Sequence, residues 1–267
     1  MRLVRPDKAA DLNAIIYSAI YGGYDEPKPF PYGLDVPAVM ITDNLRTAHQ
    51  ASVLGWYSFV VPHGIVTTKG NPAKLAPMLA HKWWKTHPGQ LRGLSVKAAR
   101  GGCAMAALAM IEAAEIALWV DGSITIDGSP YGARCLQALG SDDIAFTRHP
   151  WRDCALAEGD YSATLARYAD TRVKEQTDFY RGFHPRRWGL IATGAIAWRI
   201  NPLTRAFGEV WWDEQLNWSH QDQVSLPILL RLADEHQLAP LEGANLAWNM
   251  NLPWERWWSL ANHAVAP

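Results

Sequence analysis

Apolar runs of strand length alternate with segments of helical periodicity along most of the chain. Continuous apolar runs predict buried strands at residues 13–20, 38–42, 59–61, 116–120, 144–146 and 190–200. Helical spacing of Ala, Leu and other apolar residues predicts helices at 72–84, 102–115, 154–183 and 202–235, the last with a break near Ser219. Strands and helices alternate first, and helices dominate later. This order predicts an α/β fold with a mostly parallel central sheet flanked by helices.

The length of 267 residues suits one large domain or two small ones, and we expect one, covering residues 1–267. Stretches rich in Pro and Gly at 26–37 and 86–102 predict surface loops rather than linkers. We divide the expected domain into an alternating half at about 11–150, a helix-rich half at about 151–250, and an irregular tail at 251–267.

Charge and composition exclude several classes of function. The formal net charge of -1 provides no basic field, so we expect no nucleic-acid partner, although a basic pocket for one nucleotide stays open. The N-terminus lacks the apolar region of a secretory signal, and no apolar run approaches the ~18 residues of a membrane span. We therefore expect a cytoplasmic protein. Three cysteines without Cys-x-x-Cys spacing argue against a zinc cluster or a disulfide framework.

Two turns that follow predicted strands carry candidate binding groups. Asp121, Gly122 and Ser123 come directly after the strand at 116–120, and the carboxyl ends of parallel strands are where open α/β sheets bind ligands. Gly22 and Gly23 follow the first strand and would let the backbone approach an anion closely. Both turns also fit a purely structural role, and neither a dinucleotide fingerprint nor a Walker A loop is present.

Basic side chains occur at two further places. Lys82 and Lys85 are three residues apart on one predicted helix face, where they are either solvated charges or neutralise a diphosphate leaving group. His149 and Arg152 follow the strand end at 144–146, which would bring them to the same ligand-binding edge. A buried, hydrogen-bonded histidine is the alternative for His149.

The late helical region concentrates polar and aromatic groups. Ser219 predicts a helix cap with Asp222 in the first turn, and capping alone would explain both. A plain amphipathic helix does not require the neighbouring set of aromatics, carboxylates and amide: Trp211, Trp212, Glu214, Asp222 and Gln223. The chain has 14 tryptophans, most of which we expect in the core, with a minority available to contact the C–H face of a sugar.

Seven segments appear in an order that resembles a known family: residues 17–25, 41–43, 82–85, 119–124, 149–152, 189–196 and 211–225. Together they resemble the glycosyltransferase-like domain of plant Golgi polysaccharide-synthesis proteins and its bacterial and phage relatives, which has a GT-A type fold. The resemblance covers about residues 13–230. It implies a nucleotide-sugar donor held by the N-terminal half and an acceptor approached from the half at 151–250.

The resemblance also implies roles for individual residues. Donor contacts would come from Tyr21, Gly22, Gly23, Asp43, Lys82, Lys85, Asp121, Gly122 and Ser123. Asp121 would be the first acid of an Asp-x-Asp element that binds Mn²⁺ or Mg²⁺ bridging the two phosphates. Ser123 replaces the second acid, so Lys82 and Lys85 would carry more of the charge neutralisation. The acceptor side would be formed by His149, Arg152, Trp211 and Trp212.

Asp222 resembles the acid that contacts donor-sugar hydroxyls or acts as base, with Gln223 orienting it and Glu214 nearby as a further candidate catalytic carboxylate. The leading hypothesis is a glycosyltransferase that uses a UDP-sugar and a protein or glycan acceptor, with inversion and retention both open. A glycoside hydrolase with Glu214 and Asp222 as its carboxylate pair is one alternative. A non-catalytic carbohydrate-binding protein is another, and lipid amide hydrolysis ranks lower because a metal-binding His cluster is lacking. If the chain is phage-encoded, the host cytoplasm is its expected location.

Overall fold

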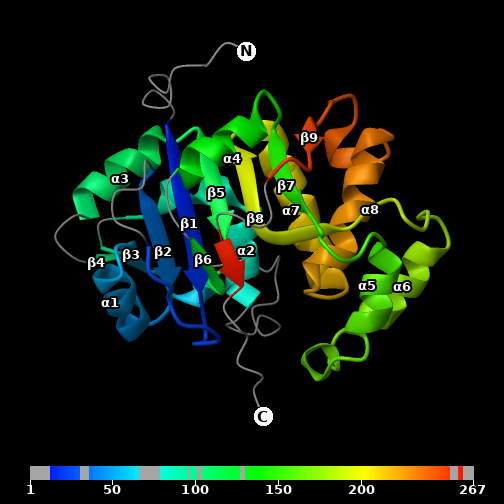
Figure 1. Ribbon diagram of the computed structural model, residues 1–267, viewed down its shortest axis with the longest axis horizontal. Helices are drawn as coiled ribbons and strands as arrows, with labels where there is room; N and C mark the ends of the chain where they lie inside the picture. The colour runs from blue at the N-terminus through cyan, green and yellow to red at the C-terminus, as the bar shows by residue number, and fades with distance from the viewer. Residues whose placement is uncertain are drawn as a thin grey trace.

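The computed structural model describes residues 13–30, 36–65, 79–95, 97–100, 104–126, 130–252 and 258–260. In this part of the chain, an eight-stranded sheet has the order β4-β3-β2-β1-β5-β8-β7-β9 (Figure 1). Its strands are β1 (Ala14–Ile20), β2 (Ala38–Thr42), β3 (Tyr57–Val60), β4 (Ala99–Arg100), β5 (Ile116–Val120), β7 (Ile144–Arg148), β8 (Ile191–Arg199) and β9 (Trp248–Asn249). A separate antiparallel pair joins β6 (Ile124–Ile126) to β10 (Trp258–Leu260).

Most strands of the large sheet run in one direction. Strands β1, β2, β3 and β5 pair in parallel, β8 runs antiparallel between β5 and β7, and β4 is antiparallel to β3. Every residue of β1, β2 and β5 is buried, as expected for parallel strands covered on both faces. The predicted α/β class with a mostly parallel sheet is confirmed. The carboxyl ends of β1, β2, β5 and β7 consequently open on one edge.

Helices cover both faces of the sheet (Figure 1). They are α1 (Leu45–Val53), α2 (Ala80–Thr86), α3 (Ala104–Ala113), α4 (Tyr131–Leu139), α5 (Ala155–Ser162), α6 (Val173–Arg181), α7 (Pro202–Asn217) and α8 (Asp222–Asp234). Side chains of α2, α3, α7 and α8 share one core with alternate residues of β1, and those of α1 and α4 share a second core with the other residues of β1.

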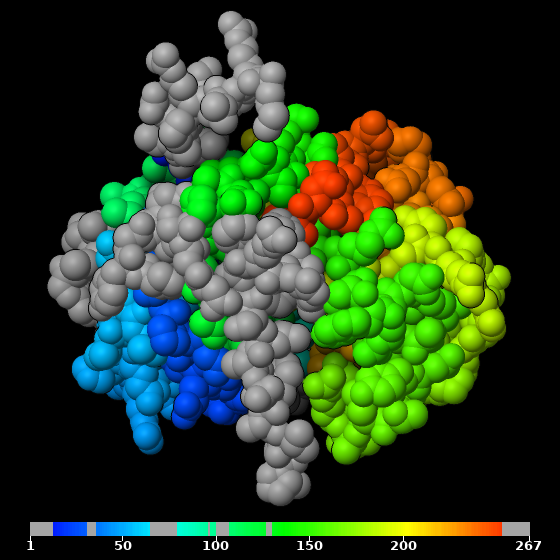
Figure 2. All heavy atoms as spheres, viewed as in Figure 1, coloured from blue at the N-terminus to red at the C-terminus, as the bar shows by residue number. Residues whose placement is uncertain are grey.

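Helices α5 and α6 pack with part of α8 around a third, smaller core. The space-filling view shows α5 and α6 at the lower right of the molecule, across from α1 at the lower left (Figure 2). No helix in the described part of the chain has the length and apolar character needed to cross a bilayer.

Most long segments were predicted well, and several short elements were missed. The single helix predicted at 154–183 was wrong, because the structure divides it into α5, a 3₁₀ turn at Ala166–Tyr168 and α6. Strands β2 and β5 have the predicted bounds, and α7 and α8 are separated by the predicted break around Ser219. Helices α1 and α4 were not predicted, nor were β4, β6, β9 and β10. These short strands exist because a partner strand supplies their hydrogen bonds, which local sequence does not reveal.

Two predicted irregular regions need correction. The expected surface loop at 86–102 contains a 3₁₀ helix at Pro88–Gly93, in which Pro88 and Leu91 are buried, and then β4. The expected irregular tail at 251–267 contains β10, which pairs with β6. Residues 1–12, 31–35, 66–78, 101–103 and 261–267 lie outside the described residues, which includes the start of the helix predicted at 72–84. The single-domain organisation stays a prediction.

Candidate active site

The turn after β5 directs one carboxylate into the carboxyl edge of the sheet. The backbone N–H of Asp121 donates to the carbonyl of Gly194 on β8 at 2.8 Å, and its carbonyl accepts from the N–H of Ile124 at 2.9 Å, which closes the turn. Its Oδ1 accepts a hydrogen bond from the indole N–H of Trp119 at 2.9 Å. A Cβ on Gly122 would lie 2.8 Å from the side chain of Ile20, so the turn packs closely against β1. These contacts hold Asp121 in a defined position.

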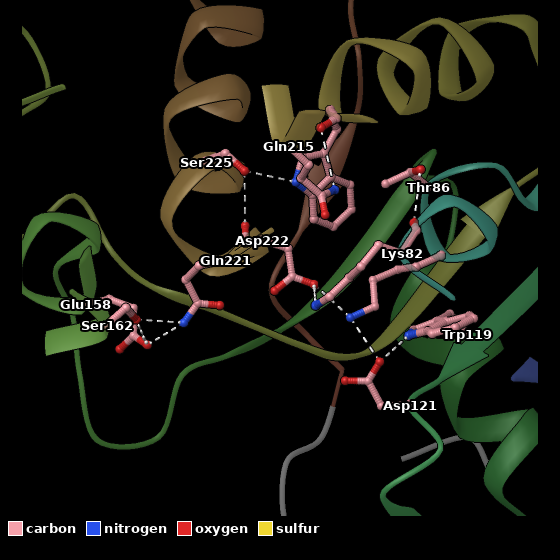
Figure 3. Close-up of polar contacts among 12 residues, drawn as sticks. Lys82, Thr86, Trp119, Asp121, Glu158, Ser162, Gln215, Gln221, Asp222 and Ser225 are labelled. Atoms are coloured by element: carbon pink, nitrogen blue, oxygen red, sulfur yellow. Dashed lines mark hydrogen bonds and ion pairs between the residues drawn. The ribbon is translucent and has the colours of Figure 1, made fainter. Parts of the chain in front are cut away.

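A buried lysine joins this carboxylate to a second one that lies about a hundred residues later in the chain. The ammonium nitrogen of Lys85 lies 2.9 Å from Oδ1 of Asp121 and 2.8 Å from Oδ2 of Asp222. Lys82 reaches the same Oδ2 of Asp222 at 2.6 Å. We call these four residues the Asp-Lys cluster, and Figure 3 shows Asp121 and Asp222 on either side of the ammonium groups. The structure therefore brings together three of the predicted segments.

Helix α2 positions both lysines because several elements hold it. Lys82 and Lys85 lie one turn apart, and the Lys85 side chain is fully buried. The hydroxyl of Tyr17 on β1 donates to the carbonyl of Lys85 at 3.3 Å. On the other side, α7 approaches so closely that a Cβ on Gly208 would lie 2.0 Å from the carbonyl oxygen of Thr86. The lysine ammonium groups are thus placed by packing on both sides of α2.

Burial and charge act in opposite directions on the cluster. Burial works to raise the pKa of Asp222, but Lys82 and Lys85 outweigh it and hold that pKa well below its usual range. Burial works to lower the pKa of Lys85, but the charges of Asp121 and Asp222 raise it above the ordinary lysine value. For Lys82 burial prevails, and its pKa is lowered despite the charge of Asp222. Asp222 is therefore ionised at neutral pH and a poor proton acceptor there.

The paired glycines meet Asp43 at the ends of β1 and β2. Gly22 and Gly23 have φ angles of 63° and 65°, a left-handed conformation that favours glycine. The N–H of Gly22 donates to both carboxylate oxygens of Asp43 at 3.2 Å. These residues were expected to contact the donor, and that role stays a prediction. The N–H of Gly22 is directed to Asp43 instead of toward a bound anion.

Two aromatic pairs beside the cluster were not predicted. Tyr24, which is 38% exposed, stacks on His81 with ring centroids 4.7 Å apart. Tyr168 and His220 lie 4.9 Å apart, and burial followed by the charge of Lys82 lowers the pKa of His220 to about 4. A neutral imidazole therefore borders the cluster at neutral pH. In the sequence, Tyr24 directly follows Gly23 and His220 directly precedes Gln221. These neighbours were the sequence signals from which Tyr24 and His220 could have been identified as site residues.

A buried carboxylate anchors the start of α8. Glu158 on α5 is 3% exposed and accepts from the Gln221 amide at 2.9 Å, and its other oxygen pairs with Arg152. Gln221 directly precedes Asp222, so this contact places the first turn of α8 (Figure 3). The predicted cap was wrong, because the hydroxyl of Ser219 donates to the Gln176 side chain at 2.6 Å. Arg152 therefore contributes to the position of α8 through its ion pair with Glu158.

We expect Glu158→Gln to lower the free energy of unfolding by about 1–3 kcal/mol, because the substitution removes the buried negative charge that pairs with Arg152. Urea unfolding measures this change. Glu175→Gln is the matched control, because Glu175 makes an ion pair with Arg172 whose two side chains are 64% and 54% exposed. That control should change stability by less than about 0.5 kcal/mol. Equal effects of the two substitutions would contradict the anchoring role of Glu158.

Other predicted residues lie away from the cluster. The expectation that Trp211 and Trp212 help form the acceptor side of the sugar site was wrong. These residues are 0% and 2% exposed and belong to the core under the sheet. Packing took precedence, since each indole buries a large apolar area. Glu214 hydrogen-bonds with Tyr180 on α6, and burial raises its pKa. It therefore belongs to a different network from Asp222.

The remaining predicted residues have mixed outcomes. Gln223 is half-buried in the first turn of α8, and among the described residues the two lysines, and not Gln223, orient the Asp222 carboxylate. His149 accepts hydrogen bonds at Nδ1 from the N–H groups of Trp151 and Arg152, at 3.3 and 3.0 Å. Burial, with Arg152, lowers the pKa of His149 to about 4. Its contact with an acceptor stays a prediction.

The side chains around Asp121 offer few ligands for a metal ion. Within the described residues, no group of three or more His, Cys, Asp or Glu side chains is placed to hold one. Oδ1 of Asp121 already faces both Lys85 and Trp119. Ser123 is buried and contributes at most one hydroxyl. Mg²⁺ and Mn²⁺ prefer several oxygen ligands, so these residues do not fit the ion that the family resemblance implies.

Comparison with known proteins finds similarity only at the level of solved structures. No family model matches the sequence, and a search among curated proteins finds no match. The mannosyltransferase Ktr4p from S. cerevisiae aligns over 86% of this chain and 69% of its own, with 6% identity and a TM-score of 0.47. Mouse xyloside xylosyltransferase 1 aligns over 85% and 83%, with 9% identity and a TM-score of 0.40. Both are glycosyltransferases, the class that the sequence motifs resemble, and neither is similar enough to assign this chain to a family.

Proposed function

We propose that this protein is a glycosyltransferase that takes a sugar from a nucleoside-diphosphate sugar, with a UDP-sugar as the expected donor and a protein or glycan as acceptor. The observation that carries the proposal is the Asp-Lys cluster at the carboxyl edge of the sheet. It joins the ends of β5, α2 and α8 at the edge where α/β folds bind ligands. Capping or surface solvation explains none of its three ion pairs, since Lys85 and Asp222 are buried.

The lysines suit stabilisation of a diphosphate leaving group. In the transfer, the bond from the anomeric carbon to the β-phosphate oxygen breaks, and the nucleoside diphosphate keeps the electron pair. An acceptor oxygen forms the new bond to that carbon and releases its proton to the departing diphosphate or to solvent. The charges of Lys82, Lys85, Asp121 and Asp222 sum to zero, so recognition would depend on N–H donors directed at the phosphates. Preorganised donors of this kind lower the barrier by stabilising charge as it develops.

Asp222 suits sugar recognition better than base catalysis. Both ammonium groups contact its Oδ2, which leaves Oδ1 as the oxygen for sugar hydroxyls among the described contacts. Its lowered pKa keeps it ionised, so it can accept charge-assisted hydrogen bonds from sugar hydroxyls but is a weak base. Tyr24, the exposed partner of the buried His81, would offer a ring face to a sugar or a base.

The hydrolase alternative receives less support from the geometry. A glycosidase needs two carboxyl groups facing one sugar, one of them protonated. Glu214 hydrogen-bonds with Tyr180 on α6, whereas Asp222 pairs with lysines on α2, so the two carboxylates face different elements. A non-catalytic sugar-binding protein would not need two largely buried ammonium groups at the carboxyl edge.

Calorimetric titration with UDP tests the proposal. We expect a dissociation constant of about 1 µM to 1 mM, with uridine binding at least about tenfold more weakly because it lacks the phosphates. Release of UDP from a panel of UDP-sugars would then identify the donor. Failure of UDP, ADP and GDP to bind, with and without Mn²⁺, would remove the donor-site assignment. Cleavage of glycosides without any response to nucleotides would favour the hydrolase, and glycan binding without donor turnover the non-catalytic alternative.

A further inference from the structure

Lys85 is the central cation of the candidate site. Its ammonium group bridges one carboxylate from the β5 turn and one from the start of α8, at 2.9 and 2.8 Å. The side chain is fully buried, and the ring of Trp119 lies 5.5 Å from the nitrogen. A divalent cation at an Asp-x-Asp element is also held by carboxylates, and it links them to the phosphates of the donor. The Lys85 ammonium group occupies the corresponding place between the carboxylates.

The position of the ammonium group leaves little room for a second cation. A metal ion bound to Asp121 would lie about 2.0–2.6 Å from a carboxylate oxygen. Oδ1 already has the Lys85 ammonium group and the Trp119 indole N–H as neighbours, each at 2.9 Å. A cation here would be repelled by Lys85 and would lack further acid ligands among the described residues.

An ammonium group has three N–H donors. Among the described residues, Asp121 and Asp222 account for two of those of Lys85, which leaves one for an anionic oxygen. We propose that Lys85 takes the place of the divalent cation, so that the protein binds the diphosphate of its donor without a metal ion. This inference rests on the proposed function.

Mn²⁺ binding, followed by the electron paramagnetic resonance signal of the free ion, tests the inference without any need for activity. We expect the wild-type protein to bind Mn²⁺ with a dissociation constant weaker than about 1 mM. Lys85→Ala should bind it at least about tenfold more tightly, because Asp121 and Asp222 then face each other without the shared ammonium group. Lys82→Ala is the matched control, since Lys82 pairs with Asp222 and leaves the bridge of Lys85 in place. That variant should show no comparable gain.

UDP titration in EDTA separates the two proposals. UDP binding that is equal in EDTA and in Mn²⁺ supports both the donor site and the metal-free mode. Binding that requires Mn²⁺, or micromolar Mn²⁺ affinity of the wild-type protein, overturns the role of Lys85 and leaves the glycosyltransferase proposal intact. Absence of UDP binding under both conditions overturns the donor site itself. The wild-type measurements stand even if Lys85→Ala does not fold.

Discussion

Asp222→Asn should reduce sugar transfer by about 100- to 1000-fold, the effect expected when one preorganised electrostatic group is removed from an active site. The substitution keeps the shape of the side chain and removes the charge that both lysines contact. Lys82 and Lys85 would then reorient toward other acceptors. Initial rates with the identified donor measure the effect, and a change in kcat larger than that in KM would indicate a role in the transition state.

The same substitution should lower the free energy of unfolding by about 3–5 kcal/mol, because it leaves two largely buried ammonium groups short of a counter-charge. The loss appears only where Asp222 is ionised. Its folded-state pKa is depressed, so its contribution is present above the unfolded value of about 3.9 and disappears as the pH falls through the folded value. Asp160→Asn is the control, since Asp160 pairs with Arg181 at the surface. If both variants transfer sugar at the wild-type rate, the site assignment is wrong.

Lys85→Met should weaken UDP binding and lower transfer, each by at least about 100-fold, because the bridging ammonium group is lost while the side-chain length is kept. The free energy of unfolding should fall by about 2 kcal/mol, less than for Asp222→Asn, since Lys82 still contacts Asp222. Lys174→Met, which removes an exposed partner of Asp178, should have little effect on either property. Unchanged UDP affinity in Lys85→Met would contradict the role of this lysine in donor binding.

The stability difference between the wild-type protein and Lys85→Met should depend on pH at the alkaline end. The raised pKa of Lys85 in the folded state means that its contribution is fully present below the unfolded lysine value of about 10.4. It is lost as the pH rises through the folded value. Urea unfolding between pH 7 and 11 should therefore show a constant difference that narrows only above about pH 10.4. A difference that narrows already near pH 7 would mean that Lys85 loses its proton there.

The long strands could be predicted from the sequence, because the burial pattern that defines them is local. The strands at 38–42 and 116–120 are continuous apolar runs, and such runs are buried wherever a sheet forms. The expectation that Asp121 reaches the ligand-binding edge also followed from local pattern, because it directly follows a parallel strand. Short pairings such as β6 with β10 depend on a partner more than a hundred residues away, which no local window contains.

The roles of individual site residues were less predictable. Trp211 was expected at a sugar-binding wall and lies in the core, since its indole N–H meets Ser225 of α8 at 3.2 Å. Ser219 was expected to cap α8, and its hydroxyl instead meets Gln176 on α6. In both cases the sequence showed a residue type that suits two environments. Which environment a residue occupies depends on the helices packed beside it.

The sequence alone established the α/β class and the order of its long elements, because periodic burial and propensity act within a few residues. It also identified Lys82, Lys85, Asp121 and Asp222 as candidates without showing that they touch. Their contact required the sheet order and the packing of α2 between β1 and α7, which place side chains up to 140 positions apart within 3 Å of one another. Burial then fixes the four side chains as one cluster, because charged groups removed from water need partners of opposite charge.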